Sequence, residues 1–539
     1  MCRGSLKIYF LNLVLLATIV PNVYGQDSLE PEMPDSFKEP MPLFTKGLGP
    51  FSRTITTELS ESQAFFDQGI QLMYAFTPED AARSFREAQI RDPLCAMCYW
   101  GEAWAWGPYM NGSMGPGSLG RAKYAIKKAL ELVGGHTNSV EEDLINAMAV
   151  RYIDRTDHTP RIKIDTVYAK AMSKVYADNP NDLDVGFLYG ESLMLLEPRR
   201  GNWNIERKEI QLIHKILEGS LFQDITHPGV CHLYIHATES TVNPEKAEEC
   251  ADHLGSSIPG ASHINHMPSH TYNRIGRWAD AVRANVQAFH SDQAAAYGEG
   301  FAIYPSHNLH MLLFAASMDG QGAIAMQAGK DYAKVTGGAK YYEILTKVRF
   351  GRFDEILEIE NDATNPIFRG FGEFGHGYAA LRTGDIDLAK KSLNALEKSA
   401  REAPEEVAFR GHSAADLLGV VGGILKGEIL REEGLLDDAI NALEVAVDIE
   451  DGLRYDEPEP LNFSARHWLG AALLEVGRPV LAEQVYLAAL SDHPHNGWSL
   501  FGLEQAVRSQ GRTAEADEVL KAFNAAWSRA DVWLRSSRF

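Results

Sequence analysis

The chain is short of positive charge and carries few cysteines. Lys and Arg number 51 against 73 Asp and Glu, a formal net charge of −22 over 539 residues, and there are 5 cysteines. Nucleic acids and anionic membranes are bound through basic surfaces, so this balance argues against both as partners. The sequence also lacks a Walker, dinucleotide-binding or Ser-His-Asp pattern, so none of these common catalytic motifs indicates a reaction.

Long apolar runs are missing as well. After the N-terminus no stretch approaches the roughly 18 uninterrupted apolar residues that a membrane-spanning helix needs. At the N-terminus, Arg3 and Lys7 precede an apolar run at 8–20, and small residues follow up to Gly25. This pattern predicts a cleaved signal peptide at 1–25 and a secreted or periplasmic protein, with no membrane span after cleavage. An uncleaved membrane anchor is the alternative.

Signal cleavage removes Cys2 and leaves an even number of cysteines. In an oxidising compartment this number favours disulfides, and proximity in sequence suggests the pairs Cys95–Cys98 and Cys231–Cys250. A redox motif is the alternative for the first pair, although no βαβ pattern surrounds it.

A repeated helical pattern organises the rest of the chain. Residues 62–93 match the tetratricopeptide pattern, which places small residues where two antiparallel helices cross and proline where the second helix ends. The matching positions are Phe65, Gly69, Ala81, Phe85, Ala88 and Pro93. Similar units with a glycine turn before the second helix recur up to about residue 535, and strand patterns are almost absent. We therefore predict an all-α fold, a tetratricopeptide-repeat α-solenoid of about 11–12 helical hairpins. A generic helical bundle is the alternative.

The repeats divide the chain by residue number. A proline-rich segment at 26–59 reads as an extended arm. It is followed by N-terminal hairpins at 60–225, histidine-rich central hairpins at 226–335 and C-terminal hairpins at 336–539.

The histidines are concentrated in the central hairpins. Ten of the 18 fall between 227 and 310, where about three are expected from length alone. Within each repeat, spacings of three and four residues return to one face of the first helix, which lines the concave groove of such a solenoid. Seven histidines on three successive first helices take these positions: His232, His236, His263, His266, His270, His307 and His310.

This arrangement predicts a transition-metal site. Imidazoles three or four residues apart on a helix can hold one metal ion, and ligation by imidazole alone suits copper or zinc. Because the outer two of three neighbouring helices lie roughly 20 Å apart, two ions that each join adjacent helices fit better than one. Glu239 and Glu191 are candidates for a ligand, an orienting carboxylate or a catalytic base. The alternative is a polar, pH-sensitive groove in which the imidazoles bind each other, Glu239 and water.

Other polar residues of the region have simpler interpretations. We expect His227 to cap a helix, His253 and His290 to lie on the surface, and His467 to stand apart from the others. The acidic segment 455–460 reads as a solvated loop or as a lid over the groove.

Several segments resemble a known group of proteins. HPGVCHLYIHATE, HINHMPSHTYNRIGRWADAVRAN and YPSHNLHMLLFAASMDG are similar to segments of a family of secreted, bacterial-type tetratricopeptide proteins. The resemblance extends along most of the mature chain. It implies the fold and no particular activity.

Three hypotheses about function follow. In the first, the protein is a metalloprotein that presents copper or zinc to an unknown small molecule. A metal-dependent enzyme is one form of this hypothesis. In the second, it is a scaffold that holds a peptide in the concave groove. In the third, it stores or delivers the metal.

Overall fold

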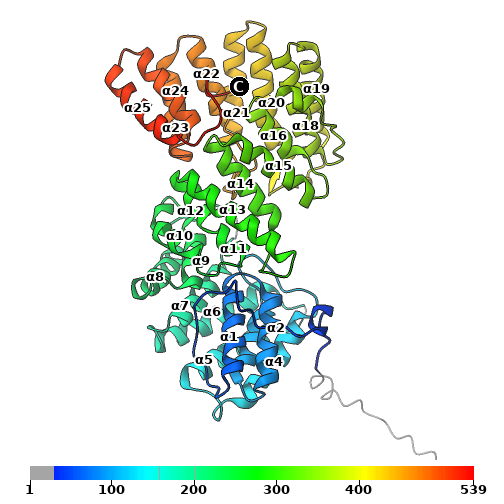
Figure 1. Cartoon of the computed structure of the whole chain (residues 1–539), viewed down its shortest axis with the longest axis vertical. Helices are drawn as coiled ribbons and strands as arrows, with labels where there is room; N and C mark the ends of the chain where they lie inside the picture. The colour runs from blue at the N-terminus through cyan, green and yellow to red at the C-terminus, as the bar shows by residue number, and fades with distance from the viewer. Residues whose placement is uncertain (1–29, 157, 199–200) are drawn as a thin grey trace, which may run out of the picture.

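Helical hairpins follow one another along the chain. The protein is described by a computed structural model that covers residues 30–156, 158–198 and 201–539 (Figure 1). The predicted signal peptide at 1–25 lies outside the described residues. The helices within them pair into twelve successive hairpins, which confirms the all-α tetratricopeptide solenoid. No helix of the described part is long and apolar enough to cross a membrane.

The N-terminal hairpins occupy the lower part of the molecule in Figure 1. Their helices are α1 (Ser60–Tyr74), α2 (Pro78–Arg91), α3 (Ala96–Ala105), α4 (Ser118–Leu132), α5 (Ser139–Tyr152), α6 (Arg161–Asp178), α7 (Leu183–Met194) and α8 (Lys208–Gln223). The central helices are α9 (Pro228–Thr238), α10 (Glu248–Leu254), α11 (Ser262–His266), α12 (Pro268–Ile275), α13 (Trp278–Ala295), α14 (Pro305–Met318) and α15 (Gly322–Val335). Short 3₁₀ helices occur at Asp35–Lys38 (η1) and Pro244–Ala247 (η2).

The C-terminal hairpins form the upper part (Figure 1). Their helices are α16 (Tyr341–Arg349), α17 (Phe353–Leu357), α18 (Pro366–Thr383), α19 (Ile386–Glu402), α20 (Ala414–Glu432), α21 (Leu436–Asp451), α22 (Arg466–Glu475), α23 (Pro479–Asp492), α24 (Gly497–Ser509) and α25 (Thr513–Ala526). A two-stranded hairpin that the sequence did not indicate, β1 (Ala408–Phe409) with β2 (His412–Ser413), connects α19 to α20.

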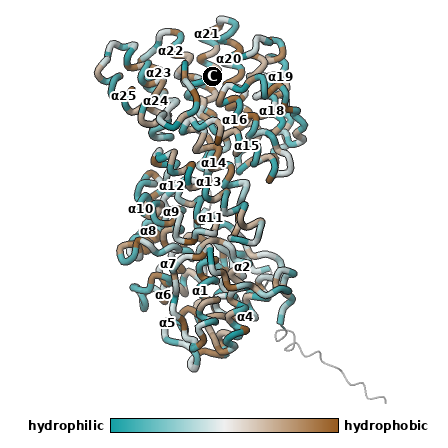
Figure 2. The backbone as a smooth tube through the Cα atoms, viewed as in Figure 1, coloured by the Kyte–Doolittle hydropathy of each residue, from teal (hydrophilic) through white to brown (hydrophobic). Residues whose placement is uncertain are grey.

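Close helix crossing explains the glycines of the repeat pattern. The ring of Phe85 on α2 lies between Gly69 and Gly101, and a Cβ at either glycine would come within 2.6 Å of that ring. Hydrophobic and hydrophilic stretches alternate along the tube (Figure 2), as expected of amphipathic helices with one apolar face toward the core.

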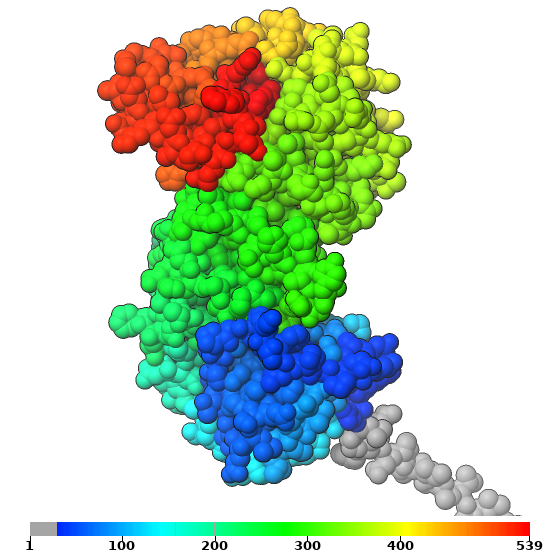
Figure 3. Space-filling model, in the orientation of Figure 1, coloured from blue at the N-terminus to red at the C-terminus, as the bar shows by residue number. Residues whose placement is uncertain are grey.

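The segment before α1 joins two parts of the solenoid. In Figure 3 this dark-blue segment lies on the surface where the blue hairpins meet the green ones. The Gly260 amide donates to the Gly47 carbonyl at 2.8 Å, and the rings of Phe44 and Phe301 meet edge to face at 4.8 Å. The arm therefore links the N-terminal hairpins to the central ones.

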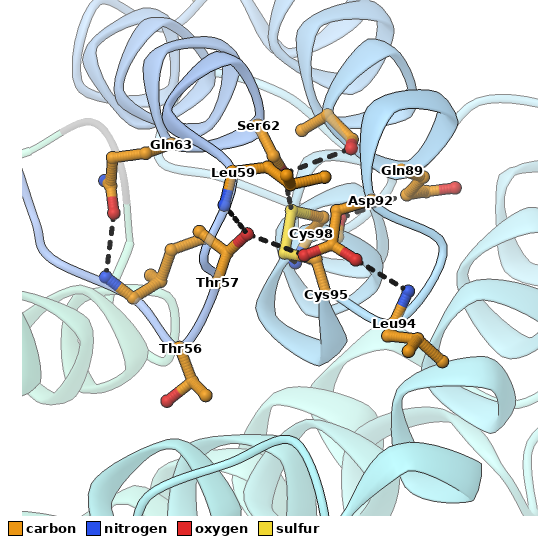
Figure 4. Close-up of a disulfide and its surroundings, with 12 residues drawn as sticks. Thr56, Thr57, Leu59, Ser62, Gln63, Gln89, Asp92, Leu94, Cys95 and Cys98 are labelled. Carbon is orange, nitrogen blue, oxygen red and sulfur yellow. Dashed lines mark hydrogen bonds between the residues drawn. A yellow bond between two sulfur atoms is a disulfide. The ribbon is translucent and has the colours of Figure 1, made fainter.

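Both cysteine pairs suggested by sequence proximity are disulfides in the structure. Cys95–Cys98 lies at the start of α3, fully buried beside α1 and the turn after α2 (Figure 4). Cys231–Cys250 joins α9 to α10. The second disulfide therefore fixes the helix that carries His232.

Candidate metal centre

Three inner helices carry the seven predicted histidines. They are α9, the α11–α12 pair and α14. The middle one is a single inner helix interrupted at Met267 and Pro268, because proline has no N–H to donate to the preceding turn. His263, His266 and His270 nevertheless stay in mutual contact, since their rings follow one another at 5.3 Å and 4.7 Å between centroids.

The first group of imidazoles joins α9 to α11. His232, His236 and His263 each offer a ligand atom, and these atoms all lie within 4.8 Å of one another. All three residues are at most 3% exposed. Their ring centroids are separated by 5.0, 4.9 and 6.3 Å.

The second group joins α11 and α12 to α14. The second group consists of His266, His270 and His307, whose ligand atoms also all lie within 4.8 Å of one another. The Nε2 atoms of His266 and His270 lie 3.1 Å apart. With metal–nitrogen bonds of about 2.0 Å, two ligands of one tetrahedral ion are separated by about 3.3 Å, so this pair already has the spacing of two ligands.

Hydrogen bonds orient two imidazoles of the first group. His232 Nδ1 lies 2.6 Å from the Tyr74 carbonyl, to which it donates, and His236 Nδ1 lies 3.0 Å from Glu239 Oε1. A neutral imidazole that donates through Nδ1 carries its lone pair on Nε2, the atom that then binds a metal.

His263 is a buried histidine whose ring makes no hydrogen bond within the described part of the protein. It is 1% exposed, and neither ring nitrogen has a hydrogen-bond partner among the described residues. Burying a polar group without a partner costs about 1–3 kcal/mol. A metal ion held with His232 and His236 would supply the missing partner, so the first group fits such an ion.

One buried carboxylate connects the two groups. Glu239, 1% exposed, lies 3.0 Å from His236 Nδ1 through one oxygen and 2.5 Å from His270 Nδ1 through the other. Glu457 adds a second contact to His270 Nδ1 at 3.1 Å. Carboxylates that accept from the second nitrogen of a metal-binding histidine fix the ring and make it a stronger ligand.

Burial and these carboxylates set the protonation of the imidazoles. Burial lowers the pKa of His263, His266 and His307 well below the usual value, which favours their neutral form. Burial also lowers the pKa of His270, but the negative charges of Glu239 and Glu457 outweigh this effect and raise the pKa to about 9. A metal bound at His270 must therefore compete with a proton.

A loop from the C-terminal hairpins covers the second group. Residues 455–460 follow α21, and Glu457 reaches His270 from there. Arg410, at the β1–β2 turn, pairs with Asp456 at 2.9 Å through Nη2 and also donates to the Glu457 carbonyl. The segment is thus held as a lid, which was one of its two interpretations.

Strained backbone surrounds the imidazoles. Phe76 (φ 58°) and Tyr304 (φ 60°) have left-handed backbone conformations that such residues rarely adopt. The Phe76 ring lies 4.2 Å from His232, and the Tyr304 ring lies 5.5 Å from His263. Strain of this kind persists where surrounding structure enforces it and is concentrated at functional sites.

Two predicted residues lie apart from these groups. His310 packs against Tyr342 at 4.3 Å between rings and joins neither group. Glu191 accepts from Trp104 Nε1 at 3.4 Å among the N-terminal hairpins, where burial raises its pKa to about 7. The structure therefore gives Glu191 no contact with the imidazoles.

The histidines of the inner helices are buried and are not displayed on an exposed groove surface. The sequence placed the histidines on the concave face, but His232, His236, His263, His266 and His270 are at most 3% exposed. Tyr74 and Phe76 of the first hairpin contact the first group, and Glu457 of the loop at 455–460 contacts His270. Sequence reasoning missed the contributions of Tyr74 and Phe76, and it named the segment 455–460 as a lid without giving Glu457 a contact, because repeat register carries no information about contacts between distant repeats.

A cavity leads toward the second group from the surface. A small space of about 30 Å³ is lined by His270 and Glu457. It shares Arg274, Tyr455 and His493 with a larger, open pocket of about 490 Å³. Of the six imidazoles, His270 is the one that borders this space, at the junction of the central and C-terminal hairpins.

Comparison with known proteins adds only distant likenesses. No family model matches the chain, and no curated protein is significantly similar in sequence. Among solved structures, the APC/C Cut9–Hcn1 complex is 12% identical over 88% of this chain and 78% of that one, with a TM-score of 0.30. A human IFIT1 dimer with m7Gppp-AAAA is 14% identical over 89% and 92%, with a TM-score of 0.29. The TPR domain of P58(IPK) is 12% identical over 84% and 99%, with a TM-score of 0.21. Scores this low carry no argument about ligands, and the chain's own helical hairpins define its class, the tetratricopeptide-repeat solenoids.

Proposed function

We propose that this protein is a metalloprotein that binds two transition-metal ions, copper or zinc, one in each histidine group. The observation that carries the proposal is that six imidazoles from three inner helices come together as two groups of three. His236 and His270 also meet Glu239 and Glu457 in a third group of mixed nitrogen and oxygen ligands, which lies between the other two. Buried imidazoles without a metal are costly to crowd together, and His263 has no other partner among the described residues.

The donor set limits the metals. Six imidazole nitrogens suit copper or zinc and are poor ligands for calcium or magnesium, which prefer oxygen. Three protein ligands leave one position open, as in catalytic zinc sites, so binding of water or a substrate at the ion is part of the proposal. Storage or delivery of the metal is an alternative form of this proposal, in which the same residues bind the metal and no substrate is involved.

We also propose a secreted or periplasmic location and membership of the secreted tetratricopeptide family that the sequence resembles. Two disulfides support an oxidising compartment, since such bonds are rare in the cytosol.

Elemental analysis tests the metal. Protein purified without a polyhistidine tag and reconstituted is expected to hold two ions per chain. His263→Ala and His266→Ala each remove a ligand from one group and should each lose one ion. His253→Ala, which changes an exposed histidine outside both groups, is the matched control and should keep both. Absence of stoichiometric metal from the folded, reconstituted protein would overturn the proposal.

A peptide-binding scaffold remains the second candidate, because this architecture is widely used for protein binding. In that case the buried histidines would not contact the peptide, and chelation of the metal would leave partner binding unchanged.

A further inference from the structure

The segment 531–539, which we call the tail, lies on the inner face of the C-terminal hairpins. It has neither helix nor strand, and the end of the chain, marked C in Figure 1, lies among α20, α21 and α22. The residues that contact the tail belong to successive first helices: Tyr378 on α18, Glu428 on α20, His467 on α22 and Trp498 on α24. In such solenoids the first helices line the concave surface that binds partners. The tail therefore occupies the place of a peptide ligand.

The tail lies on this surface as an extended segment. Its side chains are alternately exposed (Asp531, Trp533, Arg535) and partly buried (Val532, Leu534, Ser536). Successive side chains of an extended chain point to opposite sides, so one side of the tail faces the helices. From residue 532 to 539 no amide donates to a backbone carbonyl of the described residues. Side chains rather than a backbone ladder hold the tail, and segments of this kind open at low free energy.

Ser537 is the most deeply placed residue of the tail. It is 1% exposed and donates a hydrogen bond to the His467 carbonyl at 2.6 Å. Its hydroxyl oxygen also lies 2.8 Å from the Tyr486 hydroxyl. A small side chain with a hydroxyl group fits this position.

Arg538 contributes a positive charge to an acidic part of the surface. Its Nε lies 3.0 Å from Oε1 of the buried Glu428, and its Nη2 lies 3.9 Å from Glu475. Arg431 of the same helix approaches the other oxygen of Glu428 at 3.4 Å. Glu428 would therefore keep one cationic partner if the tail left, while a second arginine completes its pairing.

Phe539 is held by an aromatic ring and a glycine. Its ring meets Trp498 edge to face at 5.8 Å between centroids. The ring also lies against Gly351 in the turn after α16, where a Cβ would come within 3.1 Å of it. Its carbonyl accepts a hydrogen bond from Tyr378 at 2.5 Å. An aromatic side chain fits this position because the glycine leaves room for the ring.

We infer that the inner face of the C-terminal hairpins is a peptide-binding groove whose partner is an extended segment with a serine, an arginine and an aromatic residue in succession. The tail is the resident ligand, and such a partner displaces it. The charge of the groove selects a basic segment, because Glu428 and Glu475 face the arginine. The inference is independent of the proposed metal, since none of the six imidazoles belongs to the groove.

Binding of a synthetic peptide to the full chain tests the inference. The probe has the sequence of 531–539 with a fluorescent label at its N-terminus, and fluorescence anisotropy measures its binding. Arg538→Glu places a carboxylate beside Glu428 and should release the tail. We expect this variant to bind the probe at least about 10-fold more tightly than the unmodified chain, in which the tethered tail competes.

Two controls match this experiment. Trp533→Ala changes a tail residue whose side chain is 93% exposed, and this variant should bind the probe as weakly as the unmodified chain. A probe that itself carries Arg538→Glu should bind neither variant. Circular dichroism checks that both variants remain folded.

Hydrogen exchange of the unmodified chain is a second test, which decides the matter if Arg538→Glu fails to fold. Amides of 532–539 should exchange roughly 100-fold faster than those in the middle of α18 and α20, because the tail opens without unfolding of the hairpins. Tail amides that exchange only with global unfolding, or a folded Arg538→Glu chain that does not bind the probe, would overturn the inference and make the tail a fixed part of the fold.

Discussion

His232 on α9 hydrogen-bonds the backbone carbonyl of Tyr74 at the end of α1, with 2.6 Å between Nδ1 and oxygen, across 158 residues of sequence. The first hairpin thus touches the first imidazole group directly. The superhelix must be complete from α1 to α9 before that group has its final geometry.

Phe76 is expected to be critical at this contact. It is 1% exposed and packs on His232. Phe76→Ala should therefore lower the free energy of unfolding by about 3–5 kcal/mol. Chemical denaturation measures this loss. Phe222→Ala, at a side chain that is 93% exposed, should change it by less than about 0.5 kcal/mol, and equal effects of the two changes would argue against the packing described.

Arg410 is expected to control release of the metal. Arg410→Ala leaves the buried Asp456 carboxylate without its partner and loosens the loop that places Glu457 against His270. We expect faster transfer of the bound ion from the second group to a chelator, followed by stopped-flow absorbance. Arg401→Ala changes an exposed arginine of α19 that pairs with Glu397 on the same helix and should leave the transfer rate unaltered. Identical rates for both variants would contradict the role of the loop as a lid.

The two disulfides should differ in their contribution to stability. Cys231 and Cys250 are 19 residues apart, whereas Cys95 and Cys98 are 3 apart. Loop-closure entropy gives about 3 kcal/mol for the longer loop and about 2 kcal/mol for the shorter one. Replacing both cysteines of each pair by serine and measuring thermal unfolding should show the larger loss for Cys231–Cys250, together with weaker metal binding only in that variant.

The raised pKa of Glu191 predicts that the stability of the protein depends on pH. Its pKa is raised from 4.5 to about 7, chiefly by burial, while Arg151 acts against the shift. Below about pH 4.5 the carboxyl group is protonated in the folded and unfolded states alike. Between 4.5 and 7 only the folded state keeps the proton, so the free energy of unfolding falls as pH rises, by up to about 3 kcal/mol.

Glu191→Gln should abolish that part of the slope and make the protein more stable than the unmodified chain at pH 8. Chemical denaturation at pH 5 and pH 8 measures the free energy of unfolding of both proteins and checks this prediction. Glu209→Gln, an exposed change on α8, should preserve the slope, and a slope that survives Glu191→Gln would refute the assignment.

Repeat register predicted what depends on local spacing. Gly69 and Phe85 fall where small and large residues must meet in a helical hairpin, and the structure has them in contact. The spacing of His232 to His236 and of His266 to His270 likewise placed each pair on one helical face. These relationships are set by residues three or four apart, so the sequence contains them.

Contacts between distant repeats could not be predicted from the spacing of residues within one repeat. Tyr74 and Glu457 reach the imidazoles because the superhelix brings α1 and the loop after α21 back onto the central hairpins. His310 has the same register as its neighbours, yet Tyr342 covers it and it joins neither group. Curvature of the whole solenoid decides these cases, and no short pattern encodes it.

Anomalous diffraction tests the central claim most directly. Crystals of the untagged protein, soaked with copper and zinc and measured on both sides of each absorption edge, locate every bound ion by element. The account predicts two peaks, one beside His232, His236 and His263 and one beside His266, His270 and His307. Peaks confined to exposed histidines such as His253, with none at either group, would contradict it.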